Sequence, residues 1–181
     1  IETPDHDKDL AYLPLDHVVR VVETYVVRLR ELMKNPWHRY VLLFKNHGPQ
    51  AGASLSHAHS QIIATPVTPK DVRDRLEAAR EYYARKERCV FCDMLLAELK
   101  VGERIVEEMD GYIVWTPFDS RFPFEVHIYP RYHLHDFTGM TPEQIQGFAR
   151  VLKRTLGKLK ALLGDPPFNF VPVSYTHLTL P

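Results

Sequence analysis

The sequence predicts an α+β chain made of two copies of one unit, and three observations lead to this prediction. Segments with the 3.6-residue spacing of amphipathic helices are interspersed with short apolar runs of strand length. A weak internal repeat with a period of about 127 residues carries the same order of elements twice. Hydrophobic residues make up 45% of the 181 positions, which is enough for a packed core.

The first part of the chain is predicted to contain one long helix and two strands. Apolar side chains at helical spacing predict a helix over 16–34, which Pro36 ends. The apolar run 39–46 predicts a strand, and the small residues after it predict a turn. The alternating pattern of 56–65 predicts a second strand, in which every other side chain lies on one face.

The rest of the chain is predicted to contain three helices and three strands. A charged helix over 69–88 is followed by a short helix over 93–100. The strands are expected near 104–108, 111–116 and 124–129. The capping box Thr141-Pro142-Glu143-Gln144 begins a last helix, and Gly164 ends it. We expect Trp115, Phe118, Phe122 and Phe124 to pack in the core of this part.

The repeat also predicts how the chain is divided. It places His6 over His133, and the helix that begins near Asp16 over the one that begins near Glu143. The chain is therefore expected to begin within copy one and to end within copy two. We assign 1–68 to the C-terminal part of the first half, 69–88 to a connecting helix, 89–171 to the N-terminal part of the second half, and 172–181 to a tail. That tail, PVSYTHLTLP, resembles translated sequencing-adapter DNA, so we interpret it as non-native and His177 as non-functional.

The charge balance and the hydropathy exclude two classes of partner. The 23 basic and 23 acidic side chains cancel, so there is no electrostatic reason to expect nucleic acid. No apolar run approaches the roughly 18–20 residues that cross a bilayer, and the N-terminus has no signal-peptide pattern. We therefore predict a cytoplasmic protein with neither a nucleic-acid nor a membrane partner.

The two cysteines and ten histidines indicate a metal site. Cys89 and Cys92 form a C-x-x-C pair, which is typical of half a zinc site or of a redox pair. A redox pair normally opens a helix directly after a strand, whereas this pair follows a long charged helix. Histidines are available to complete a tetrahedral shell, so zinc is favoured over a redox pair and over an inert pair.

The segment from Asn46 to Gln61 carries the strongest catalytic signal. His57, His59 and Gln61 alternate along the predicted second strand, so they are expected on one face. The turn before them offers backbone N–H groups, an amide and a hydroxyl, which together can hold phosphate oxygens. A neutral imidazole beside such a turn can attack phosphorus and form a phosphoramidate. This arrangement predicts nucleotidyl transfer through a covalent histidine.

At these residues the sequence resembles a known family. FKNHGPQAGASLSHAHSQIIATP is similar to the active-site segment of galactose-1-phosphate uridylyltransferases, a branch of the histidine-triad superfamily. FPFEVHIYP, the histidine after it and PPFNFV resemble the second half of the same enzymes. The resemblance covers roughly residues 1–171 and implies two histidine-triad-like halves, each an antiparallel sheet with packed helices, and both incomplete in this chain. Gln61 stands where triad hydrolases carry a third histidine.

The resemblance implies a role for each residue of the substrate site. His59 would be the nucleophile that takes up the nucleotidyl group, and Gln61 would hydrogen-bond the transferred phosphoryl group. The residues expected to hold the nucleotide phosphates are Asn46, Gly52, Ala53 and Ser54. The expected reaction moves a uridylyl group between UDP-glucose and a hexose 1-phosphate such as galactose 1-phosphate. The alternatives are an adenylyl-transferring relative, which would be an ADP-sugar or dinucleoside-polyphosphate phosphorylase, and a non-catalytic zinc-binding module.

The resemblance also implies two zinc shells, each completed by residues outside this chain. His6 and His57 would be ligands of the first zinc. Cys89, Cys92 and His133 would be ligands of the second. His127 is the alternative to His133, which we prefer because the repeat pairs it with His6. Family members often form dimers, so a homodimer is a further expectation.

Overall fold

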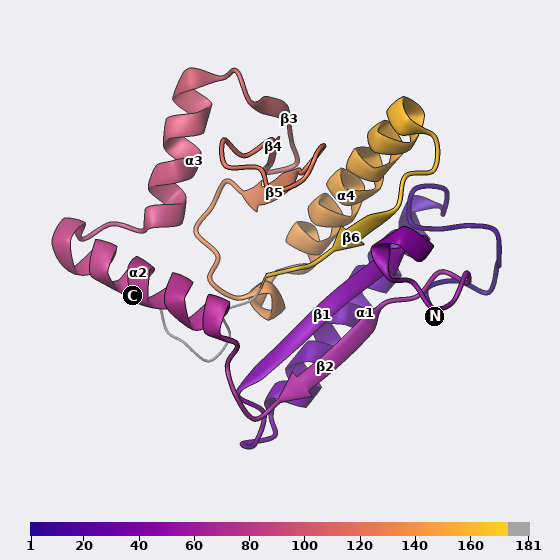
Figure 1. Ribbon diagram of the computed structural model, residues 1–181, viewed down its shortest axis with the longest axis horizontal. Coiled ribbons are helices and arrows are strands. Elements are labelled where there is room, and N and C mark those ends of the chain that lie inside the picture. Colours follow the sequence, from indigo (N-terminus) through magenta and orange to yellow (C-terminus); the bar gives the residue numbers. More distant parts are fainter. Residues whose placement is uncertain (174–181) are drawn as a thin grey trace.

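The computed structural model describes residues 1–173 and has the mixed α+β fold that the sequence predicts (Figure 1). The helices are α1 (Leu15–Met33), α2 (Lys70–Lys86), α3 (Val90–Val101) and α4 (Pro142–Leu163), with 3₁₀ turns at Pro49–Ala51 and Phe137–Gly139. The strands are β1 (Tyr40–His47), β2 (Gln61–Thr65), β3 (Ile105–Met109), β4 (Tyr112–Trp115), β5 (His127–Pro130) and β6 (Phe168–Phe170). The tail 172–181 that we interpret as non-native lies, from 174 on, outside the described residues.

Two small antiparallel sheets organise these elements. One has the strand order β2-β1-β6 and the other β3-β4-β5. In the first sheet Phe44 pairs with Gln61, and Asn46 pairs with Asn169 of β6. Directly opposed residues of an antiparallel pair share a face, and so do alternate residues of one strand. Asn46, Gln61 and Asn169 therefore lie on the same face of this sheet.

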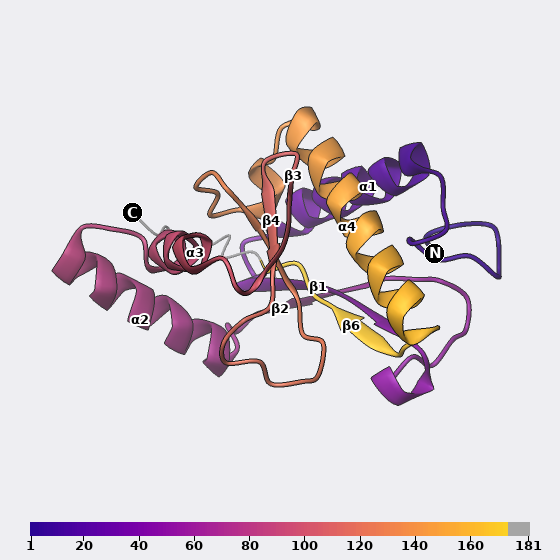
Figure 2. The same ribbon diagram turned by 90° about the horizontal axis from the view of Figure 1, so that it is seen from above.

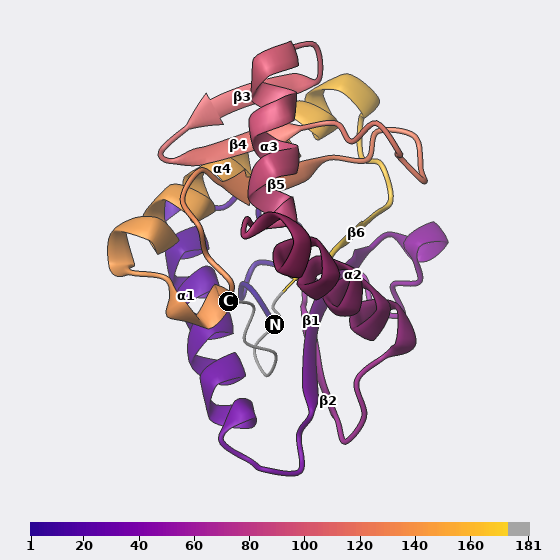
Figure 3. The same cartoon turned by 90° about the vertical axis from the view of Figure 1, so that its left-hand side faces the viewer.

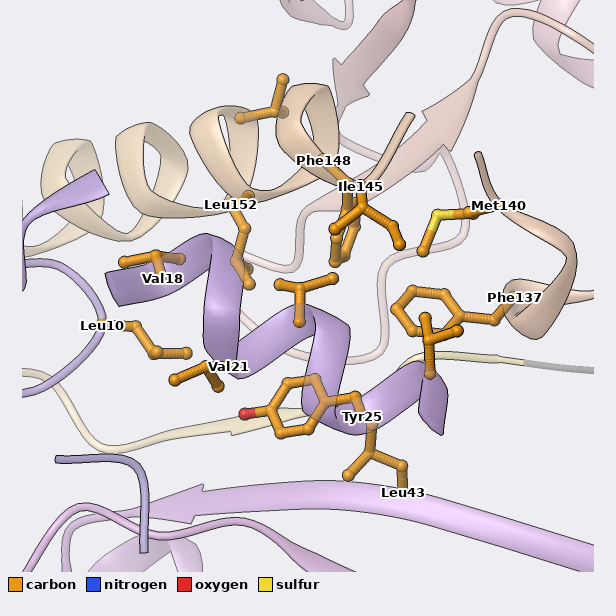
Figure 4. Close-up of a cluster of buried hydrophobic side chains, with 14 of the residues drawn as sticks. Leu10, Val18, Val21, Tyr25, Leu43, Phe137, Met140, Ile145, Phe148 and Leu152 are labelled. Carbon is orange, nitrogen blue, oxygen red and sulfur yellow. The ribbon is translucent and has the colours of Figure 1, made fainter. Parts of the chain in front are cut away.

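The other face of this sheet is covered by the two long helices. α1 and α4 lie side by side in Figures 1 and 2, and their apolar faces meet. Figure 4 shows Val18 of α1 on the side of Leu152 of α4, and Tyr25 of α1 next to Leu43, which reaches the cluster from β1. Each such side chain contributes about 1.5–3 kcal/mol by leaving water. This core holds β1 in place, and β1 carries the candidate site.

The core also crosses the predicted division of the chain. α1 and β1 belong to the predicted first half, whereas α4 and β6 belong to the predicted second half. β6 nevertheless pairs with β1, and α4 packs on α1. The order helix-then-strand occurs in both parts, as the repeat implies. The division of the chain into four parts stays a prediction. A core to which both halves contribute does not show whether the halves arose as two copies of one unit.

A second, smaller cluster lies under α3. Figure 3 shows α3 in front of the sheet β3-β4-β5, and Leu95 of α3 packs there on Ile113 and Trp115. Trp115 is buried as expected, but the expectation for the three phenylalanines was wrong, because Phe118, Phe122 and Phe124 are 86%, 71% and 57% exposed. They lie in the connection between β4 and β5 and are not among the residues packed in this cluster.

Most predicted elements are present with shifted ends. The capping box of α4 is confirmed: the Thr141 side chain accepts a hydrogen bond from the Gln144 backbone, and the Gln144 side chain accepts one from the Thr141 N–H at 2.8 Å. α3 begins at Val90, earlier than predicted, and Cys89 is its N-cap residue. Among residues 1–173, no helix has the length and apolar character needed to cross a membrane.

Candidate active site

The segment that holds His57 and His59 is not part of a strand. The predicted strand 56–65 was too long, because β2 begins only at Gln61. Upstream of Gln61 the chain is held by other partners: the Glu2 N–H donates to the Ala58 carbonyl at 3.0 Å. The N-terminal segment therefore occupies the hydrogen-bonding position that a strand partner would take, and the strand ends there.

One local hydrogen bond sets the protonation pattern of His59. Its side chain is almost buried, with 8% of the residue exposed, and its Nδ1 lies 2.8 Å from the His57 carbonyl oxygen. A carbonyl oxygen only accepts, so Nδ1 carries the hydrogen. In the neutral ring Nε2 is then the unprotonated nitrogen. Such a nitrogen can attack an electrophilic phosphorus atom.

His57 and His6 face each other through their Nδ1 atoms, 3.0 Å apart. The His57 Nε2 donates to the Thr3 carbonyl at 2.7 Å, so the Nδ1 of the neutral ring is unprotonated and accepts from the His6 Nδ1. The second nitrogen of His6 lies 3.3 Å from the Ser56 hydroxyl. Within the described residues, no third acidic, cysteine or histidine ligand lies close enough to join this pair.

The turn between β1 and the histidine segment has a defined conformation. Gly48 and Gly52 have φ values of 81° and 84°, a region that glycine adopts without strain. The N–H groups of Gly52 and Ala53 donate inside the turn, to the carbonyls of Pro49 and Gly48. Ser54 is exposed at the end of the turn. In this conformation the Ser54 hydroxyl and the Asn46 amide are the groups best placed to meet a ligand.

Asn169 joins this turn from a distant part of the chain. Its Nδ2 donates to the Asn46 Oδ1 at 2.8 Å and to the Ala51 carbonyl at 2.9 Å. The Asn46 Nδ2 in turn lies 3.4 Å from the Gly52 carbonyl. Sequence reasoning missed Asn169, because the motif PPFNFV says nothing about which strand β6 pairs with. Gln61 is half-buried on the same face of the sheet.

The three residues predicted as ligands of the second metal lie together in the structure. One ligand atom from each of Cys89, Cys92 and His133 lies within 4.8 Å of the others, and the Cys92 Sγ is 3.3 Å from the His133 Nδ1. His127, the alternative, does not join them. It lies on β5, pairs with Glu125 at 3.0 Å and stacks on Tyr129. The structure thus brings His133, and not His127, to the cysteines.

This donor set fits zinc. Two sulfurs and one imidazole are ligands that tetrahedral zinc sites use. Both cysteines are free and half-buried. Burial and the neighbouring Cys89 raise the pKa of the Cys92 thiol to about 11. Two adjacent thiolates would repel each other, and a bound cation would relieve this repulsion.

A second group of possible ligands is an ion-pair cluster. Asp9, His47 and Asp165 also lie close together. Lys160 already forms ion pairs with both aspartates, at 2.7 Å from Asp9. The Lys160 ammonium neutralises negative charge on the two carboxylates, which would otherwise attract a metal ion. We therefore interpret this cluster as a link between α4 and the N-terminal segment.

In this chain the histidine segment lies between the turn after β1 and the start of β2. Its fold is the histidine-triad type that solved uridylyltransferase-like proteins share with it, at TM-scores of 0.86 and 0.87. The chain is a homologue of proteins named galactose-1-phosphate uridylyltransferase, and its structural neighbours are uridylyltransferase-like. Residues 1–66 also match a family described as the N-terminal domain of DUF4931, a domain of unknown function.

Three relatives support this relationship. The galactose-1-phosphate uridylyltransferase of Thermotoga maritima is 37% identical over 94% of this chain and 53% of its own length. The ADP-glucose phosphorylase of Arabidopsis thaliana is 30% identical over 100% of this chain and 51% of its own length. A solved uridylyltransferase structure superposes with a TM-score of 0.88 and 37% identity, over 94% of this chain and 54% of that one. The chain thus spans about half the length of the curated relatives that it matches.

Proposed function

We propose that the protein is a nucleotidyltransferase that uses His59 as a covalent carrier. The proposed reaction moves a uridylyl group between UDP-glucose and a hexose 1-phosphate such as galactose 1-phosphate, in galactose metabolism. The observation that carries the proposal is the hydrogen bond from His59 Nδ1 to the His57 carbonyl, which leaves Nε2 as the attacking nitrogen. The identity to a uridylyltransferase across most of the chain supports it.

The proposed reaction has two balanced steps. The Nε2 of His59 attacks the α-phosphorus of UDP-glucose and forms an N–P bond. The bond from that phosphorus to the bridging oxygen breaks, and glucose 1-phosphate leaves with the electron pair. A phosphate oxygen of the second hexose 1-phosphate then attacks the same phosphorus and breaks the N–P bond. UDP-hexose is released and the neutral imidazole is restored.

The residues around His59 have supporting roles in this proposal. The Gln61 amide would donate to a non-bridging oxygen of the transferred phosphoryl group, where charge develops. Asn46 and Ser54 would hold the phosphates, and Gly52 and Ala53, whose N–H groups donate inside the turn, would shape the turn around them. The shared sheet face of Asn46 and Gln61 supports this assignment, since one ligand can then reach both.

Zinc is the proposed cofactor. His6 and His57 would hold one ion through their facing Nδ1 atoms, and Cys89, Cys92 and His133 would hold the other. Zinc at these positions would supply structural cross-links between segments distant in sequence. The His57 ligand would also restrain the carbonyl that orients His59. A homodimer and a cytoplasmic location complete the proposal.

The second candidate function is adenylyl transfer, as in an ADP-glucose phosphorylase. The 30% identity to the Arabidopsis thaliana enzyme favours it, and no described contact distinguishes uracil from adenine. In that reaction inorganic phosphate would take the place of the hexose 1-phosphate as the attacking group. The catalytic use of His59 would be the same.

Incubation with UDP-glucose or ADP-glucose, each labelled in the α-phosphate, tests both candidates. We expect an acid-labile, base-stable adduct on the protein that is lost in His59→Gly and kept in His135→Gly, a histidine that is exposed and outside the site. The nucleotide that forms the adduct identifies the base. Absence of an adduct with either nucleotide sugar would overturn the proposal and leave the non-catalytic zinc-binding module.

A further inference from the structure

A fully buried ion pair lies directly behind the histidine segment. The Lys45 Nζ is 2.6 Å from the Glu2 Oε2, and the two side chains are only 1% and 2% exposed. Lys45 is on β1, on the core face of the sheet, next to Asn46 on the opposite face. Burying such a pair costs several kcal/mol per ion before the attraction is counted, and apolar replacements of buried pairs are often as stable. A contribution to the stability of the fold is therefore a weak explanation for the presence of this ion pair.

The hydrogen bonds of the pair converge on the histidine segment. The Lys45 Nζ also donates to the His59 carbonyl at 3.3 Å. The Glu2 Oε1 accepts from the Ser60 hydroxyl at 2.6 Å and from the Tyr25 hydroxyl at 2.8 Å. The Glu2 backbone N–H donates to Ala58. Three consecutive residues, 58–60, are thus each held by Glu2 or Lys45.

These hydrogen bonds take the place of the backbone hydrogen bonds that a neighbouring strand would supply. The ladder between β1 and β2 begins only at the pair Phe44–Gln61, so the residues before it have no strand partner. The carbonyl of His57 must stay 2.8 Å from the His59 Nδ1 for the ring to keep its tautomer. Motion of the backbone at 57–60 would weaken that hydrogen bond. The imidazole could then rotate, and Nε2 would no longer keep one direction.

The charge states of the network are compatible with this role. Burial, and then the Glu2 carboxylate, raise the pKa of Tyr25 far above its usual value. Tyr25 therefore remains a phenol that donates to Glu2. The Lys45 ammonium offsets the carboxylate, so each buried group has a partner.

We infer that the Glu2–Lys45 pair positions the candidate nucleophile, by fixing the backbone of 58–60 so that the His59 imidazole keeps its Nδ1–H tautomer. This inference rests on the proposed function for its catalytic meaning, but the tautomer can be measured without turnover. Lys45 and Glu2 are positioning residues, since they act on His59 and not on a substrate.

The test uses the double variant Glu2→Gln/Lys45→Met, which removes both charges without leaving either one buried alone. Nitrogen-15 NMR of the histidine rings identifies which nitrogen carries the hydrogen. We expect the wild type to show Nδ1–H at His59 and the double variant to show both tautomers in exchange. The rate of adduct formation at saturating nucleotide sugar should fall about tenfold or more, with little change in KM.

A control variant removes both charges of another ion pair, with Glu→Gln again and Arg→Met in place of Lys→Met. Glu98→Gln/Arg104→Met removes an ion pair of 2.7 Å between α3 and the start of β3, outside the site. It should leave the His59 tautomer and the adduct rate unchanged. If Glu2→Gln/Lys45→Met does not fold, Ser60→Ala removes one hydrogen bond of the network and should produce a smaller shift in the same direction.

The outcomes separate this inference from the proposed function. A single Nδ1–H tautomer and an unchanged adduct rate in the double variant would overturn the positioning role. If the wild type forms no adduct while the tautomer still depends on Glu2 and Lys45, the transferase proposal fails and the positioning role stands. If the wild type forms the adduct and the double variant keeps both the Nδ1–H tautomer and the adduct rate, the transferase proposal stands and the positioning role fails.

Discussion

Asn169 donates a hydrogen bond to Asn46 at 2.8 Å, although 123 positions separate the two residues in the sequence. The same amide group also reaches the Ala51 carbonyl inside the turn. Asn169 thus connects β6 to the turn that we propose for phosphate binding. It also orients the Asn46 amide, since Asn46 Oδ1 is occupied and its Nδ2 is directed toward the turn.

Removal of this connection should weaken nucleotide binding. Asn169→Asp replaces the donor by a carboxylate that repels both the Asn46 Oδ1 and a phosphate. We expect about tenfold weaker binding of UMP or AMP by calorimetry, since each lost hydrogen bond is worth about 0.5–1.5 kcal/mol and repulsion adds to it. Asn35→Asp, in the connection between α1 and β1, makes the same change away from the site and should not alter the affinity. Equal affinities in all three proteins would contradict the role of Asn169.

Metal content should distinguish the two histidines considered for the cysteine site. Cys89→Ser should lower the zinc bound per chain by one equivalent, because a serine hydroxyl is a much poorer ligand than a thiolate. His133→Ala should lower it too. His127→Ala should retain the zinc, since His127 hydrogen-bonds Glu125 and lies outside the cluster. Elemental analysis of the purified variants measures this, and zinc loss in His127→Ala alone would reverse the assignment.

The α1–α4 core should dominate stability. Leu152→Ala removes a side chain that is 2% exposed and should lower the free energy of unfolding by about 2–5 kcal/mol. Leu162→Ala is the control on the same helix, because Leu162 is 69% exposed. Its effect should stay within about 0.5 kcal/mol. Urea unfolding measures both, and similar losses would show that this core is not the main source of stability.

Glu107 should make stability depend on pH in the acid range. Burial raises the pKa of its carboxyl, but hydrogen bonds from Lys158 and Arg154 outweigh burial and leave the pKa below its usual value. A lowered carboxyl pKa stabilises the fold above the unfolded value, and this contribution disappears as the pH falls through the folded value.

Glu107→Gln should therefore be less stable than the wild type at pH 7. The difference in Tm between the two proteins should begin to narrow as the pH falls below the ordinary glutamate pKa of about 4.3, and it should disappear only as the pH falls through the lower pKa of the folded state. Thermal unfolding across this range measures it. A constant difference from pH 7 down to pH 3 would mean that the ion pairs of Glu107 do not contribute.

Local sequence patterns were sufficient for the helices and for most strands. The apolar stripe and the capping box predict α4 because both depend only on residues within a few positions of one another. The C-x-x-C pair and the repeat likewise led to His133. Alternation failed at 56–65, because a strand also needs a partner, and there the N-terminal segment takes that place.

The sequence by itself determined the chemistry that is available: a histidine segment after a glycine-rich turn, and a C-x-x-C pair with histidines elsewhere in the chain to complete it. Only the tertiary structure decided how these groups are held. The partners of Asn46 and His59 lie on β6 and in the N-terminal segment, and no periodicity reports a contact between residues so far apart. Lys45 illustrates the limit: its charge in a strand pattern resembles a surface residue, whereas the fold buries it against Glu2 behind His59.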